Sequence, residues 1–145
     1  MKIEILYGTE TGNAEMLADD VAASLADRHT VNCTSLADTD PGALAEADLN
    51  LILCSSYGDG EMPASAKPFA ARLEAIETLD PAPRVAVFGL GDSEYAETYG
   101  QAPKTLAAML GARGAQVLGD VPVHDASGED EVEEIAIPWA AALLE

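Results

Sequence analysis

Strand-like and helix-like patterns alternate along this chain, and that alternation constrains the fold more than any other feature. Strands are expected at residues 2–7, 30–34, 49–54, 84–88 and 116–123. Helices are expected at residues 13–25, 64–79, 102–112 and 129–144, with at most a couple of helical turns at 41–47. The run LNLILC at 49–54 lacks polar alternation, which is typical of a strand covered on both faces. Strands separated by helices predict an α/β fold, with a parallel sheet between helical layers.

The 145 residues are expected to form one domain, 1–145, because no internal repeat, linker or second pattern interrupts the alternation. The longest apolar runs are too short to cross a bilayer, and MKIEIL lacks the layout of a signal peptide. Cys33 and Cys54 fall in predicted strands without metal-ligand spacing, so we expect buried, reduced thiols. The lack of a membrane span and of a signal peptide, together with reduced cysteines, predicts a soluble cytoplasmic protein.

Pro138 is expected to bend or interrupt the last helix.

The charge of the chain is extreme, with 26 acids against 7 bases and a formal net charge of −19. Nucleic-acid binding is excluded, because phosphate backbones require a basic footprint. Two explanations of the acidity stay open: adaptation to a salt-rich cytoplasm, or an acidic face that steers a basic partner. The second is favoured by acids in two loops discussed below, namely Asp59, Glu61, Asp92, Glu94 and Glu97.

The loops after the first, third and fourth predicted strands are the richest in glycine, hydroxyl and tyrosine residues. They read YGTETGNAE, SSYGDGEMP and GLGDSEYAETYG. In an open parallel sheet, ligands bind outside the carboxyl ends of the strands, where the strand order reverses. These three loops are therefore the predicted ligand site.

The first loop is suited to an anion. It offers short polar side chains and a glycine just before a helix whose free N–H groups point back at it. It contains neither GxxxxGK[ST] nor GxGxxG, and the nearest bases are Lys2 and Arg28. We therefore predict a phosphate site of neutral donors, with simple helix capping by Thr11 as the alternative.

The second and third loops each carry a tyrosine among small polar residues. Tyr57 and Tyr95 could cover opposite faces of one planar ring, with Asp92 at its polar edge. The alternatives are a surface turn for Tyr57 and packing of Tyr95 against its own helix. A terminal phosphate, a spacer and a planar polar ring describe FMN.

In their order and spacing, the three loops resemble those of flavodoxins. The resemblance extends along the whole chain. The resemblance implies a doubly wound, five-stranded parallel sheet of order 2-1-3-4-5 that binds FMN. The short-chain type is implied, because residues 116–123 lack the long insertion of the other type. In having alanine at position 14 and tyrosine at position 57, the chain is similar to the FMN domains of diflavin reductases. Since no reductase segment follows Glu145, a free-standing protein is expected.

The resemblance also implies roles for individual residues. The phosphate cradle would be formed by Thr9, Glu10, Thr11, Gly12, Asn13 and Ala14, of which Ala14 lacks a donor hydroxyl. The ribityl chain would be met by Ser55 and Ser56. The two ring faces would be covered by Tyr57 and Tyr95, and the pyrimidine edge would be contacted by Leu90, Gly91 and Asp92. The peptide of Gly58, next to Asp59, would turn its carbonyl toward flavin N5.

The function implied is electron transfer rather than enzymatic turnover. We expect a monomeric carrier that cycles between semiquinone and hydroquinone and docks with a basic reductase and a basic acceptor. No membrane partner is expected. Two alternatives stay open: an FMN-dependent NAD(P)H:quinone reductase, and an accessory protein that uses the fold for binding.

Overall fold

The computed structural model describes residues 2–9, 13–55, 63–91, 101–119, 121–125 and 131–143. Within these ranges one parallel sheet contains β1 (Lys2–Gly8), β2 (Thr30–Ser35), β3 (Leu49–Ser55), β4 (Arg84–Gly91), β5 (Gln116–Val117) and β6 (Val123–Asp125). The strand order is β2-β1-β3-β4-β5, and β6 also pairs with β4. The helices are α1 (Asn13–Leu25), α2 (Lys67–Glu74), α3 (Gln101–Ala112) and α4 (Val132–Leu143), with 3₁₀ turns η1 (Leu36–Asp38) and η2 (Pro41–Glu46). The predicted fold class and strand order are confirmed.

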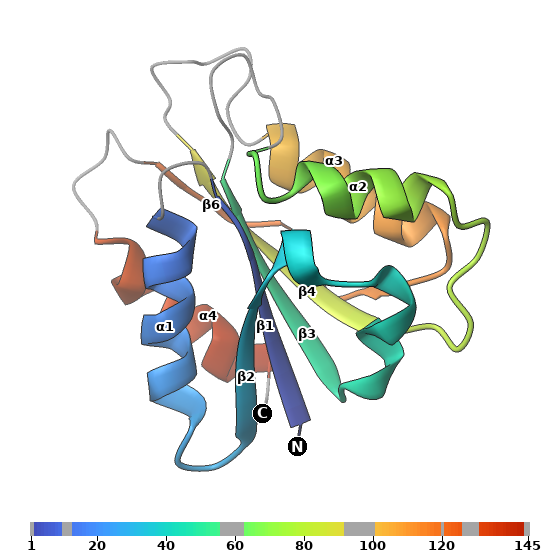
Figure 1. Ribbon diagram of the computed structural model, residues 1–145. Coiled ribbons are helices and arrows are strands. Elements are labelled where there is room, and N and C mark those ends of the chain that lie inside the picture. The colour runs from blue at the N-terminus through green and yellow to red at the C-terminus, as the bar shows by residue number, and fades with distance from the viewer. Residues whose placement is uncertain are drawn as a thin grey trace.

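Helices cover both faces of the sheet, with α1 and α4 on one side and α2 and α3 on the other (Figure 1). Side chains of β3 alternate between the two cores: Leu51 and Leu53 face α1 and α4, whereas Ile52 and Cys54 face α2 and α3. All four are buried. This confirms that the apolar run is covered on both faces.

The polar member of that run, Asn50, is also fully buried. Its amide nitrogen donates to the carbonyl of Leu44 at 2.8 Å and to the carbonyl of Arg84 at 3.1 Å. Asn50 therefore joins η2 to the start of β4, which offsets part of the cost of burying an amide, although its Oδ1 has no hydrogen-bond partner among the described residues.

The predicted fifth strand is not continuous, and this part of the prediction was wrong. Gln116 and Val117 pair with the start of β4, and Val123 pairs with Gly89 near its end. Val117 pairs with Val85 and Val123 pairs with Gly89, but the chain has two more residues between Val117 and Val123 than between Val85 and Gly89. The extra residues leave the hydrogen-bonded ladder between β5 and β6. Gly119 permits this detour with a φ of 69°, a region that other residues rarely adopt.

Helix α2 is shorter than the helix predicted at 64–79. Its first residue is Lys67, because residues 63–66 form a turn in which Ala66 N–H donates to the Pro63 carbonyl. At its other end the Arg113 guanidinium binds the carbonyls of Leu73 and Ile76, at 2.6 and 3.0 Å. The helix end is thus held by a side chain from a distant part of the chain.

Helix α3 ends as predicted near its two glycines. Gly114 has a φ of 97°, and the N–H groups of Gly114 and Ala115 donate to the carbonyls of Gly111 and Leu110. This is a Schellman motif, which satisfies the last carbonyls of the helix. Helix α4, by contrast, continues through Pro138, so of the expected bend or interruption, the interruption does not occur. The Glu134 carbonyl, which loses its helical donor there, belongs to an exposed residue that water can reach.

Both cysteines are free thiols, as predicted, but only Cys54 is fully buried. Burial raises the pKa of the Cys54 thiol to about 12. Partial burial, with Asp19 and Glu4 nearby, raises the pKa of Cys33 to about 11. Both thiols therefore stay protonated at neutral pH.

Across the described residues, no helix is both long enough and apolar enough to span a membrane. The same residues contain no cluster of three or more potential metal ligands.

Candidate functional site

The carboxyl ends of four strands lie in one row at one edge of the sheet. The register pairs Gly8 with Cys54, Ser55 with Leu90, and Gly91 with Asp125. This edge is at the top of Figure 1, and the chain leaves β1, β3, β4 and β6 there. The segments predicted to bind a ligand therefore start side by side, although they are far apart in sequence.

A topological switch point lies between β1 and β3. The connection after β1 leads to α1 on one face of the sheet, and the connection after β3 leads to α2 on the other face (Figure 1). Connections that diverge in this way leave a crevice between neighbouring strand ends, which is the usual ligand position in such sheets. The predicted position of the site is therefore the switch point.

Six of the predicted site residues lie in the described ranges, and the structure brings all six to this edge. Thr9 follows β1, Asn13 and Ala14 open α1, Ser55 ends β3, and β4 ends with Leu90 and Gly91. The other nine lie outside the described residues: Glu10, Thr11, Gly12, Ser56, Tyr57, Gly58, Asp59, Asp92 and Tyr95. The roles of all fifteen stay predictions.

The first turn of α1 supplies the neutral donors that an anion needs. Helix α1 begins at Asn13, so the N–H groups of its first turn lack helical acceptors and carry the positive end of the helix dipole. Ala14 is fully buried and adds no hydroxyl. Lys2 begins β1 and Arg28 follows the end of α1, so both bases lie at the opposite edge of the sheet. A phosphate at this edge would therefore be held without help from these two cations.

Tyr7 lies one residue before the end of β1. Its phenol donates to Glu15 Oε1 at 3.4 Å, which joins the end of the strand to the first turn of α1. Partial burial, and then the nearby charge of Glu15, raise the pKa of Tyr7. The phenol therefore stays neutral at physiological pH and serves as a hydrogen-bond donor.

Two glycines at the strand ends allow unusually close packing, and sequence reasoning did not identify their role. A Cβ on Gly8 would lie 3.0 Å from both Ala66 Cβ and Leu36 Cδ1. A Cβ on Gly89 would lie 2.6 Å from Pro103 Cγ. The starts of α2 and α3 are thereby drawn against the strands that carry the site.

We expect Gly89→Ala to lower the free energy of unfolding by roughly 1–3 kcal/mol, because the rigid Pro103 ring must move to admit the methyl group. Urea denaturation measures the change. Gly111→Ala is the matched control, since its new methyl would meet Val117 at an ordinary 3.7 Å. That control should gain up to about 1 kcal/mol from helix propensity. Equal stability of the two variants would contradict the packing at Gly89.

Ser65 is a second feature that the sequence did not reveal. Its hydroxyl accepts a hydrogen bond from Thr9 N–H at 2.7 Å and donates one to the Thr9 carbonyl at 3.1 Å. The Ser65 N–H also donates to that carbonyl at 3.4 Å. A serine 56 positions away along the chain thus binds the residue that opens the first loop.

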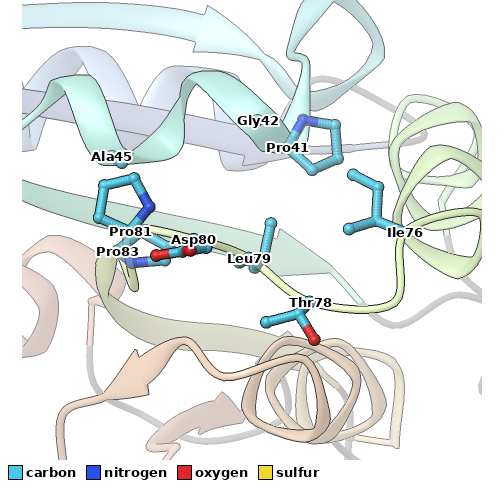
Figure 2. A pocket seen from close by; sticks show the side chains of 9 residues that line it. All are labelled: Pro41, Gly42, Ala45, Ile76, Thr78, Leu79, Asp80, Pro81 and Pro83. Atoms are coloured by element: carbon cyan, nitrogen blue, oxygen red, sulfur yellow. The ribbon is translucent and has the colours of Figure 1, made fainter.

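A small hollow of about 90 Å³ lies at the opposite edge of the sheet, between η2 and the connection from α2 to β4. Figure 2 shows its lining, formed by Pro41, Gly42, Ala45, Ile76, Thr78, Leu79, Asp80, Pro81 and Pro83. Ligand pockets usually enclose about 300–1,000 Å³, so this hollow is too small for a mononucleotide. It also lies away from every described residue of the predicted site.

Comparison with known proteins identifies relatives of this chain. A family model described as Flavodoxin matches residues 5–139. Flavodoxin YqcA of Pectobacterium carotovorum subsp. carotovorum is 34% identical over 142 residues, which cover 97% of this chain and 93% of that protein. The structure of oxidised Flavodoxin 2 from Bacillus cereus matches with a TM-score of 0.83 and 33% identity, over 99% of this chain and 98% of the other.

The chain is also similar to one part of larger proteins. NADPH-dependent diflavin oxidoreductase 1 of Cryptococcus neoformans var. neoformans serotype D (strain JEC21 / ATCC MYA-565) is 31% identical over 145 residues. That match covers 97% of this chain but 23% of the oxidoreductase, so the chain spans less than a quarter of that relative's length.

Proposed function

The chain belongs to the flavodoxin family, and on this basis we propose that it binds FMN at the carboxyl edge of the sheet and carries single electrons between proteins. The observation that supports this most is that the strand ends from which the three predicted loops start lie together at one switch point. The unit that binds the cofactor would be the whole of residues 1–145.

The groups expected at this edge are suited to FMN. A phosphate would be held by backbone N–H groups and uncharged side chains of the first loop and the first turn of α1, at Thr9, Glu10, Thr11, Gly12, Asn13 and Ala14, of which Glu10 and Ala14 would contribute only their backbone. The ribityl chain and the flavin ring would be held by Ser55, Ser56, Tyr57, Gly58, Asp59, Leu90, Gly91, Asp92 and Tyr95. Bound FMN supplies the capacity to accept and release electrons one at a time. The chain's own contribution is to bind, orient and shield the ring.

The charge of the chain supports a basic redox partner. Many carboxylates are exposed on the described surface, among them Glu15, Asp19 and Asp20 on α1 and Glu131 and Glu134 at the start of α4. Such a surface attracts a positively charged protein and raises the rate of encounter at low salt. We infer a monomeric cytoplasmic carrier with a basic reductase as donor and a basic protein as acceptor.

Titration of the purified protein with FMN, followed by stepwise reduction, tests this function. We expect one FMN per chain with a Kd below micromolar, and two resolved one-electron steps. Failure to bind FMN at micromolar concentrations would overturn the proposal. Two reduction steps at the same potential would contradict transfer of single electrons. A rate of reduction by a basic reductase that is unchanged by salt would exclude electrostatic docking.

Direct oxidation of NAD(P)H by the FMN-loaded protein distinguishes a carrier from a quinone reductase. We expect no turnover beyond that of free FMN, because a carrier receives electrons from another protein. Turnover with a quinone acceptor would favour the enzyme instead. Stable co-purification with a partner, whether or not FMN is bound, would favour an accessory binding protein.

A further inference from the structure

We propose that Ser65 is a positioning residue for the phosphate-binding loop, acting through the backbone of Thr9; this inference depends on the proposed FMN function. The Ser65 hydroxyl contacts both backbone polar groups of Thr9, at 2.7 and 3.1 Å. Thr9 is the first residue after β1. Ser65 therefore acts at the point where the chain turns from the strand into the loop.

The surroundings of Ser65 hold its hydroxyl in place. Ala66 N–H and Lys67 N–H both donate to the Pro63 carbonyl, at 2.9 and 3.2 Å, which closes a turn around Ser65. Ala66 is fully buried and lies against Gly8, where a Cβ would approach it to 3.0 Å. Because Gly8 has no side chain, this turn lies close enough to β1 for Ser65 to reach Thr9.

These bonds have a consequence for the phosphate. The Thr9 N–H is directed at Ser65 Oγ, so it does not donate to an anion in the loop. The Thr9 carbonyl is held by the Ser65 hydroxyl and N–H, so both peptide groups that flank this residue have a fixed direction. Backbone N–H donors to the phosphate must then come from later residues, whose positions follow from the direction in which Thr9 starts the loop, and Thr9 itself could contribute only through its side chain.

Ser65 also connects two parts of the site. It lies two residues after the second loop, at residues 55–63, which is predicted to carry the ring-stacking Tyr57. Through Ser65, the segment that follows the ring loop is bonded to the start of the phosphate loop. Loss of the hydroxyl should therefore weaken recognition of the phosphate more than recognition of the ring.

The test compares FMN with riboflavin, which has the same ring but no phosphate. For Ser65→Ala we expect the Kd for FMN to rise about tenfold and the Kd for riboflavin to change less than twofold. Ser65→Thr keeps the hydroxyl and should retain the FMN affinity of the original chain. Ser24→Ala is the matched control, because the Ser24 hydroxyl bonds only within α1, to the Val21 carbonyl.

Amide hydrogen exchange gives a second readout that requires no flavin. The Thr9 N–H should exchange at least about tenfold faster in Ser65→Ala, and at its original rate in Ser24→Ala. An unchanged exchange rate would overturn the role of Ser65, as would an equal loss of FMN and riboflavin affinity. Failure of the original chain to bind either flavin would instead overturn the proposed function, and the role of Ser65 with it.

Discussion

Phe88→Ala is expected to lower the free energy of unfolding by about 3–5 kcal/mol, because it leaves a cavity in the middle of the sheet. Phe88 lies in β4 with no exposed surface, and its ring packs against Trp139 of α4 with the ring centroids 5.3 Å apart. Truncation removes this contact and the burial of the ring. For a chain of this size, such a loss should lower Tm by roughly 10 °C.

Trp139 is the only tryptophan, so its fluorescence reports directly on this core during denaturation by urea. Phe88→Leu is the control, since it keeps most of the apolar volume and should cost much less, about 1–1.5 kcal/mol. If the alanine variant unfolded within 1 kcal/mol of the original chain, the packing of α4 against β4 would be wrong.

Added salt is expected to stabilise the protein by several kcal/mol. The net charge is −19, so the negative charges repel one another, and they lie closer together in the compact state than in the unfolded chain. The positive charges of Arg72 and Arg113, whose guanidinium groups donate to backbone carbonyls, are already included in this net charge. Raising the ionic strength from about 0.01 M to about 1 M shortens the screening length from roughly 30 Å to roughly 3 Å.

Thermal unfolding in a series of KCl concentrations measures this effect, and sucrose separates screening from general stabilisation of the compact state. A charge-reduced variant is the matched control, with Asp20→Asn, Asp27→Asn, Glu74→Gln and Glu77→Gln at exposed positions. It should be more stable than the original chain at low salt and should respond less to KCl. An identical salt response of the two proteins would show that self-repulsion does not limit stability.

The sequence by itself determined the class of the fold and the edge of the sheet at which the site is predicted. Strand and helix periodicities are local, since each depends on residues a few positions apart. For this reason LNLILC was predictable as a strand buried on both faces, and Gly114 as the end of α3. The rule that parallel strands present their carboxyl ends at one edge then predicted, without any distance information, that the three loops start side by side.

The tertiary structure decided the features that depend on residues far apart in the chain. The end of α2 is held by Arg113, and the first loop is anchored by Ser65. The close approach at Gly89 requires Pro103, and the division of the fifth strand follows from its register with β4. In each case a side chain or backbone group is placed by a partner on another element, and no local pattern specifies which partner that is.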